Sequence, residues 1–240
     1  MELLPLILVV VLFSVVQSIA GVGLLIFGTP TLLLLGYPFE SIIAILLPCS
    51  IPLSAAQTWH GRTNLGLLKK TFWICVAPCM VVGLGLVVLK ILQINITLWV
   101  GILLLFSGIV RAFPRARYML DTMIQRSGGL YLAATGLVHG LTNMGGGLLT
   151  IFVASHAKNK LAIRSNIAYA YLTMGILQIL TLLVLKPSAF EPINLLLIPL
   201  SVVVYFAIGN RVFLKIPEYI YQRFVTLLIF LYGVLLLSCG

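Results

Sequence analysis

The stretch GLVHGLTNMGGGLLTIFVAS, residues 136–155, determines how this chain folds. It is an apolar run interrupted by the polar pair Thr142 and Asn143, and then by three consecutive glycines that begin at Gly145. A second stretch, QSIAGVGLLIFGTPTLLLLG at residues 17–36, has the same order of apolar, small or polar, and apolar residues. Because glycine permits sharp turns, both stretches indicate an apolar helix that breaks and starts again.

The composition places both stretches in a membrane. Hydrophobic residues make up 61% of the 240-residue chain, only 8% are charged, and the mean hydropathy is +1.18. Soluble domains carry roughly a quarter charged residues, so these few charges could not cover a water-soluble fold. Apolar runs of about 20 residues have the length of membrane-spanning helices and not of barrel strands. We therefore expect an all-α integral membrane protein, built as a polytopic helix bundle.

The basic residues behind the net charge of +10 indicate how this chain is oriented in the membrane. In a soluble protein it would suggest nucleic acid, but the basic residues of this chain lie almost wholly in loops between apolar runs. We expect membrane lipid and no nucleic acid as partners. The N-terminal segment lacks a basic region and a small-residue cleavage site, so we interpret it as a retained span. The expected location is a bacterial cytoplasmic membrane, with many crossings.

The chain divides into two halves of one plan. The first, residues 1–112, has a broken segment at 3–36 and spans at 41–59, 71–89 and 96–110. An arginine-rich cytoplasmic linker is expected at 113–127. The second half, residues 128–240, has a broken segment at 128–155 and spans at 161–185, 193–210 and 224–239. A duplication of this kind is common in transporters.

The basic residues also predict how the two halves are oriented. If each broken segment crosses the membrane once, the 15 Lys and Arg residues divide 8 against 7 between the two sides. If each broken segment enters and leaves on the same side, 13 lie on one side, with Lys90 and Lys186 on the other. Because positively charged loops stay in the cytoplasm, the second arrangement is favoured. The two halves then have opposite orientations and form inverted repeats.

Each break is expected to place the start of its second helix near the membrane midplane. The first turn of a helix offers unpaired N–H groups and partial positive charge, so two such starts would hold an anion. We place no Lys or Arg inside the spans, so backbone N–H groups and neutral side chains would have to bind it. The candidate residues are Gln17, Ser18, Gly21, Gly23, Ser50, His139, Thr142, Asn143, Gly145, Gly146, Gly147, Ser165 and Asn166.

Several of these residues also have an interpretation without a ligand. Small residues often lie at helix contacts in membranes, and Gly136 and Gly140 form a GxxxG pair of that kind. His139 could couple transport to a proton gradient, or could be a neutral histidine bonded to a nearby carbonyl. Four polar residues could either line a pathway or bond helices together: Gln57, Tyr169, Tyr171 and Gln178.

The sequence shows no catalytic constellation. It contains no recognisable nucleophile–base pair or metal-ligand cluster, and no Lys-Ser/Thr follows the three glycines as in a phosphate-binding loop. Cys75 and Cys79 could share a helix face, but no His or acidic residue lies near them, so we expect packing residues. We therefore expect neither an enzyme nor a bound cofactor.

Three features together resemble the TauE/SafE sulfite exporter family. They are the glycine break at 143–147, its degenerate copy at 20–30, and the loop HGRTNL at 60–65. The resemblance covers nearly the whole chain in length, duplication and loop pattern. In the first half only Gly21 and Gly23 stand where the family commonly has a fuller glycine cluster. The resemblance implies transport of sulfur-containing anions such as sulfite, sulfoacetate or thiosulfate.

We therefore predict a secondary transporter or facilitator for small sulfur-containing anions. A cytoplasm-negative potential drives an anion outward by about 2.3 kcal/mol per charge per 100 mV, and no carboxylate lies within the expected spans to carry a coupling ion. Export is therefore the favoured direction. The alternatives are an uptake permease for another small anion or sulfur compound, and a non-transporting membrane assembly subunit. A homodimer is also left open.

Overall fold

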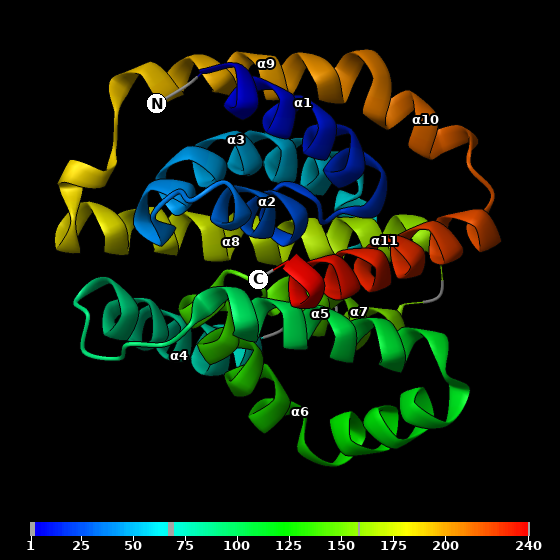
Figure 1. The fold of residues 1–240 in the computed structure, drawn as a ribbon. Coiled ribbons are helices and arrows are strands. Elements are labelled where there is room, and N and C mark those ends of the chain that lie inside the picture. The colour runs from blue at the N-terminus through cyan, green and yellow to red at the C-terminus, as the bar shows by residue number, and fades with distance from the viewer. Residues whose placement is uncertain (1–2, 67–69, 158, 240) are drawn as a thin grey trace.

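The computed structural model describes residues 3–66, 70–157 and 159–239, and these form helices joined by short connections (Figure 1). Parts of the basic loops counted above, residues 67–69 and Lys158, lie outside the described residues. Five helical stretches of the described chain are long and apolar enough to cross a membrane: α1 (Leu3–Ala20), α3 (Phe39–His60), α8 (Lys160–Leu185), Pro192–Lys215 and Tyr219–Ser238. The all-helical, polytopic architecture expected from composition is confirmed.

The remaining helices complete the two broken segments and the connections. Pro192–Lys215 is continuous through η4 (Pro192–Leu196), α9 (Leu197–Val204), η5 (Tyr205–Gly209) and α10 (Asn210–Lys215), and the last span lies in α11 (Glu218–Cys239). α5 (Ile96–Ala112) and α6 (Pro114–Thr142) form a bent pair with an angle of 103°. Shorter elements are η1 (Leu24–Gly28), α2 (Thr29–Leu34), η2 (Arg62–Asn64), α4 (Lys70–Val88), α7 (Gly145–His156) and η3 (Pro187–Ala189).

The segment expected to be a linker is helical from Pro114 onward. Proline suits the first turn of a helix because its missing N–H would have no partner there, and helix-forming residues follow it. The helix bends at Ser127, whose φ of −139° and ψ of 43° are not helical. This bend divides α6 into a first part that follows α5 and a second part that carries the chain into the second break.

Helices of the two halves pack on each other in matching pairs. α3 packs on α8 and α5 on α11, while α1 lies against α9, η5 and α10, and α6 lies against α4 (Figure 1). α3 and α8 are antiparallel, since Lys186 bonds Glu40 at one end, with Nζ and Oε1 2.5 Å apart, and Gly61 touches Ser165 at the other. The interior therefore lies between elements that are far apart in the sequence.

Two described basic residues, Lys160 and Arg117, lie near the end of the bundle where α8 begins. Lys160 donates to the carbonyls of Phe213 and Ile216 at the end of α10. Arg117 reaches Ala154 near the end of α7, from which a short connection leads to α8. Lys186 lies at the opposite end of α8, beside Glu40.

Candidate functional site

The first break lies between α1 and η1. α1 ends at Ala20, and Gly21 adopts a left-handed conformation with φ of 76°, its N–H donating to the Gln17 carbonyl over 2.8 Å. Gly23 then precedes the first residue of η1, and a Cβ there would overlap the Gln17 backbone nitrogen. Both glycines are therefore required, one by its backbone conformation and one by the close approach of two chain segments.

The second break has the same construction. α6 ends at Thr142, and Asn143 adopts a left-handed conformation with φ of 61°, its N–H donating to the His139 carbonyl over 2.8 Å. A Cβ on Gly145 would overlap His139 Cβ, six residues earlier in the chain, as Gly23 lies against Gln17. Asparagine is among the few residues other than glycine that adopt this conformation readily, which is why it can stand in this turn.

Polar side chains surround the first break. Gln17 Nε2 donates to Ser50 Oγ over 2.9 Å and to Ser54 Oγ over 3.2 Å, and its Oε1 accepts from the N–H of Leu24 over 3.2 Å. Gln57 Nε2 donates to the Gln17 carbonyl over 2.7 Å, so it satisfies the end of α1. The restart of the helix is thus tied to α3 through Gln17.

A second polar network joins the second break to α8 and to the first half of the chain. His139 Nε2 lies 3.1 Å from Gln178 Oε1, and Gln178 Nε2 lies 3.4 Å from Asn143 Oδ1. Asn143 Nδ2 donates to Thr29 Oγ1, in α2, over 2.9 Å. The two broken segments are therefore in direct contact, through side chains and not through the glycines alone.

All thirteen candidate residues are buried, but their side chains do not all face the breaks. Gln17, Ser50 and Asn143 belong to the networks described above. Ser18, Thr142 and Ser165 donate to carbonyls of their own helices, and Thr142 Oγ1 also accepts from the N–H of Met144, within the second break, over 3.2 Å. Asn166 donates to the Asn64 carbonyl over 2.8 Å. Ser165 and Asn166 are therefore held where α8 meets the end of α3.

The glycines fall into two groups by what surrounds them. Gly136 and Gly140 lie against the backbone of α4, at Val76 and Met80, so close helix packing accounts for them. Gly145, Gly146 and Gly147 lie at the start of α7, where they face His139, Tyr171 and Ser107 respectively. A side chain at Gly146 would overlap the Tyr171 hydroxyl. This glycine therefore keeps a hydroxyl group close to the first turn of α7.

Some buried side-chain polar atoms have no hydrogen-bond partner among the described residues; four of them lie near the two breaks, and the others belong to Ser14, Asp121 and Asn194. At the second break they are the hydroxyl of Tyr171 and Nδ1 of His139, whose rings are 5.8 Å apart. Near the first break they are Oε1 of Gln57 and Nε of Arg164. Because almost all buried polar groups in native proteins are paired, two such atoms at each break are consistent with a further partner there, such as water or a ligand.

Arg164 corrects the expectation that no cation lies within the spans. It is 1% exposed, belongs to the transmembrane helix α8, and packs against Gly21 of the first break. Its Nη1 donates to the Ser18 carbonyl over 3.0 Å, and its guanidinium lies 3.5 Å from the centre of the Phe213 ring. The expected span 161–185 contains Arg164, but the basic residues just before it, up to Lys160, favour counting Arg164 with the loop; Arg164 follows Lys160 by one helical turn. The four-residue spacing of Lys160 and Arg164 also indicates that both lie on one face of a helix.

A family comparison covers nearly all of this architecture. The family model described as sulfite exporter TauE/SafE matches residues 6–236. The matched region includes both breaks, α8 with Arg164, and the helix pairs that hold them. No curated protein and no solved structure gave a significant match to the chain.

Proposed function

The chain belongs to the sulfite exporter TauE/SafE family, and on this basis we propose that it carries small sulfur-containing anions out of the cytoplasm. It is a multi-pass membrane protein, and its family is one of membrane transporters. The substrate class we propose is sulfite, a sulfonate such as sulfoacetate, or thiosulfate. We further propose that the anion binds where the two broken helices touch.

The second break supports this proposal most directly. α7 has 12 residues, and the N–H of Gly147 in its first turn donates to the Met144 carbonyl over 3.1 Å, while Gly145 and Gly146 have no preceding helical turn to bond. The unpartnered hydroxyl of Tyr171 lies against Gly146 in that same turn. Backbone N–H groups and a hydroxyl donor converging on one buried point suit the oxygens of a sulfur oxyanion.

Arg164 supplies the charge that the first break needs. It covers the carbonyl end of α1, where the helix dipole is negative and would repel an anion. Its side chain keeps one donor, Nε, without a partner among the described residues. We propose that Arg164 attracts the anion at the cytoplasmic end of the path and passes it to the breaks.

The repeat relationship supports an alternating-access mechanism. Gly21 and Asn143, the two left-handed residues, are 122 residues apart, as are Gly23 and Gly145 and also Gln17 and His139. The helix pairs α3 with α8 and α5 with α11 join corresponding elements of the two halves. We propose that the halves, residues 1–112 and 128–240, are inverted repeats that rock about these pairs.

The positions of the acidic residues and the sign of the membrane potential support export as the direction of transport. Among the acidic side chains that the structure describes, Glu40 lies at the start of α3 and is bonded to Lys186, Glu191 lies in the connection after α8, and Asp121 lies in the first part of α6. A coupling proton or sodium ion would therefore find no carboxylate among the described residues of the five candidate spans, apart from Glu40, which is bonded to Lys186. A cytoplasm-negative potential of 100 mV favours export of a monovalent anion by about 2.3 kcal/mol, roughly 50-fold in concentration.

Efflux from proteoliposomes tests the proposal. Vesicles loaded with sulfite, and given an inside-negative potassium diffusion potential, should release sulfite faster than vesicles without protein. Asn143→Gly should lower the rate at least tenfold, because glycine keeps the left-handed turn but removes the carboxamide. Thr181→Val is the matched control, since the Thr181 hydroxyl bonds the Leu177 carbonyl of its own helix.

The two alternatives give different results in the same assay. An uptake permease would move sulfite or another sulfur anion inward against the potential, and only with a second gradient. An assembly subunit would show no protein-dependent flux of sulfite, sulfoacetate or thiosulfate in either direction. Equal rates for wild type, Asn143→Gly and Thr181→Val would remove the breaks from the transport path.

A further inference from the structure

A groove of about 370 Å³ lies at the end of the bundle where α8 ends. The connection from α8 to α9 forms one wall of it, and this connection is the yellow segment that leads up to α9 in Figure 1. The volume falls within the roughly 300–1,000 Å³ of ligand pockets. None of the thirteen candidate residues at the breaks is among the described residues that line it, so the groove is a separate feature.

The long wall of the groove is apolar. It consists of Ala44 and Pro48 of α3, Ile179 and Leu183 of α8, and Leu195 of η4. The two residues from α3 are one helical turn apart, and so are the two from α8, so the wall extends along both helices into the membrane. A hydrocarbon chain that lies parallel to α3 and α8 would be buried against this wall.

Asn194 brings an unpaired carboxamide to this groove. The residue is 4% exposed and lines the groove from η4. Its backbone N–H donates to the Glu191 carbonyl over 3.0 Å, but Nδ2 and Oδ1 of its side chain have no hydrogen-bond partner among the described residues. Because a buried amide without partners is unfavourable, we expect beside it a group that both accepts and donates hydrogen bonds.

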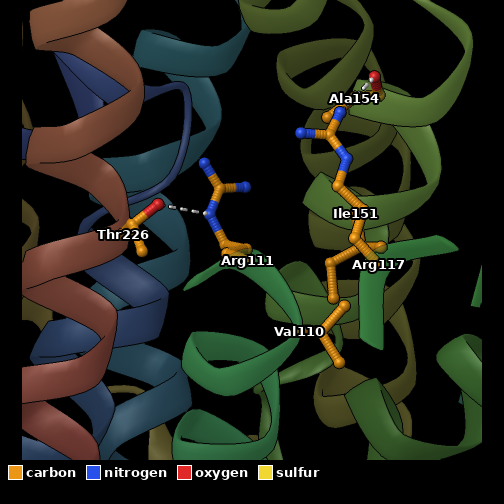
Figure 2. A pocket seen from close by; sticks show the side chains of 6 residues that line it. All are labelled: Val110, Arg111, Arg117, Ile151, Ala154 and Thr226. Atoms are coloured by element: carbon orange, nitrogen blue, oxygen red, sulfur yellow. Dashed lines mark hydrogen bonds between the residues drawn. The ribbon is translucent and has the colours of Figure 1, made fainter. Parts of the chain in front are cut away.

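The arginines at another cavity, in contrast, have partners within the protein. This cavity of about 100 Å³ lies between α5, α6, α7 and α11, with Arg111 and Arg117 on opposite sides of it (Figure 2). Arg111 Nε donates to Thr226 Oγ1 over 3.2 Å, and Arg117 Nε lies 3.9 Å from Asp121 Oδ2. The groove beside Asn194 is therefore the better candidate for a bound molecule.

Glu191 adds a negative charge at the exposed end of the groove. Its side chain is exposed and lines the groove, and it shares one turn with Asn194. Near this end of α8, Glu40 is bonded to Lys186, whereas Glu191 has no ion pair among the described residues. A carboxylate at the membrane surface attracts a cationic headgroup and repels an anionic one.

We propose that this groove binds one phospholipid with an ethanolamine headgroup. The primary ammonium of that headgroup has three N–H donors, enough for both the Glu191 carboxylate and Asn194 Oδ1. Asn194 Nδ2 donates to an ester or phosphate oxygen of the same lipid, and one acyl chain lies along the apolar wall. A choline headgroup carries the same charge but has no N–H, and a glycerol headgroup lacks the positive charge.

A lipid in this groove would connect three elements of the two halves. It would contact α3, α8 and η4 at the same end of the bundle. Because α3 and α8 form one of the pairs that join the halves, the bound lipid would stabilise their packing. The proposal does not depend on which solute the breaks transport.

Thermal unfolding of the delipidated protein in a neutral detergent tests this proposal. Phosphatidylethanolamine and phosphatidylcholine with identical acyl chains are added separately. At about a hundred times the Kd of the ethanolamine lipid, that lipid should raise the Tm by roughly 5 °C more than the choline lipid. Glu191→Gln and Asn194→Leu should each abolish at least half of this difference. Ser188→Ala, at an exposed position of the same connection outside the described lining, should keep it.

Asn194→Leu also separates lipid binding from folding. Leucine has nearly the same shape as asparagine without its unpaired polar atoms, so the delipidated variant should unfold at no lower temperature than wild type. A lower Tm in lipid-free detergent would reveal a partner for the carboxamide within the protein and would overturn the proposal.

The remaining outcomes also decide. Equal rises with both lipids in wild type would indicate a lipid coat without headgroup recognition and would overturn the proposal. A full difference kept in either Glu191→Gln or Asn194→Leu would overturn it too, because both side chains contact the headgroup region. A difference that Ser188→Ala also removes would belong to the connection as a whole and not to the two proposed ligands.

Discussion

The carboxamide of Asn143 donates a hydrogen bond to the hydroxyl of Thr29 over 2.9 Å and so joins the two broken helices across 114 positions of sequence. Asn143 is also the left-handed residue of its own break and lies 3.4 Å from Gln178. One side chain therefore shapes the second break, touches α8 and reaches the first broken segment. A movement of either half that separates the breaks must change this bond.

We expect Thr29→Val to weaken the contact between the breaks without removing the turn. The lost bond contributes about 1 kcal/mol, which corresponds to roughly 2–4 °C in Tm for a chain of this size. Combined with Asn143→Gly, Thr29→Val should cost almost nothing further, because its partner is already absent. Thermal unfolding of the two single variants and the double variant measures this coupling. Additive losses would show that the bond contributes nothing to stability.

Gly146→Ala should damage the protein through Tyr171. A Cβ at Gly146 would overlap the Tyr171 hydroxyl, so either α7 or the tyrosine must shift. We expect sulfite efflux to fall at least tenfold, and Tyr171→Phe in the same chain to restore part of the stability by making space. Gly128→Ala is the control, since a Cβ there meets only Phe152 Cε2 at 3.9 Å. If the double variant unfolds at the same temperature as Gly146→Ala, the hydroxyl is not the obstacle.

Arg164→Gln should lower both the stability and the transport rate, but for different reasons. The buried guanidinium donates to the Ser18 carbonyl, which also accepts from Gln57 over 3.2 Å, and to Asn210 Oδ1, so its loss removes a donor from both acceptors at a cost of about 1–3 kcal/mol. Arg164→Lys keeps the charge and should preserve a larger share of the anion efflux than of the stability. Arg211→Gln removes an exposed charge nearby and should change neither. Efflux rates normalised to folded protein separate the two effects.

The breaks could be predicted because glycine and asparagine are poor helix formers, and a cluster of them interrupts an otherwise continuous apolar run. Burial of the candidate residues was also implied by the sequence, but the direction of each side chain was not. Ser18 lies in the break region, yet its hydroxyl bonds Ser14 in its own helix. Sequence patterns assign Arg164 to a loop because charge is normally excluded from spans, and only the packed structure supplies the carbonyl and the aromatic ring that hold it.

The linker shows a second limit of sequence patterns. Residues 113–127 contain too many charged and polar residues for a span, which predicts a cytoplasmic linker but does not specify its local structure. The structure shows a helix, because Pro114 begins it and strong helix formers continue it. Periodicity alone could not place Arg117 opposite Arg111, since that depends on the 103° bend between α5 and α6.

Cysteine labelling tests the orientation on which the inverted repeats depend. In a variant whose four native cysteines are replaced by serine, Arg115→Cys should be protected from an impermeant maleimide added outside intact cells. Ser188→Cys, in the connection after α8, should react under the same conditions. Both positions are exposed in the structure, so burial does not explain a difference between them. Permeabilised cells should label at both positions. If Arg115→Cys reacts from outside intact cells, the basic end of the bundle is not cytoplasmic, and the proposed route from Arg164 to the breaks would run the opposite way.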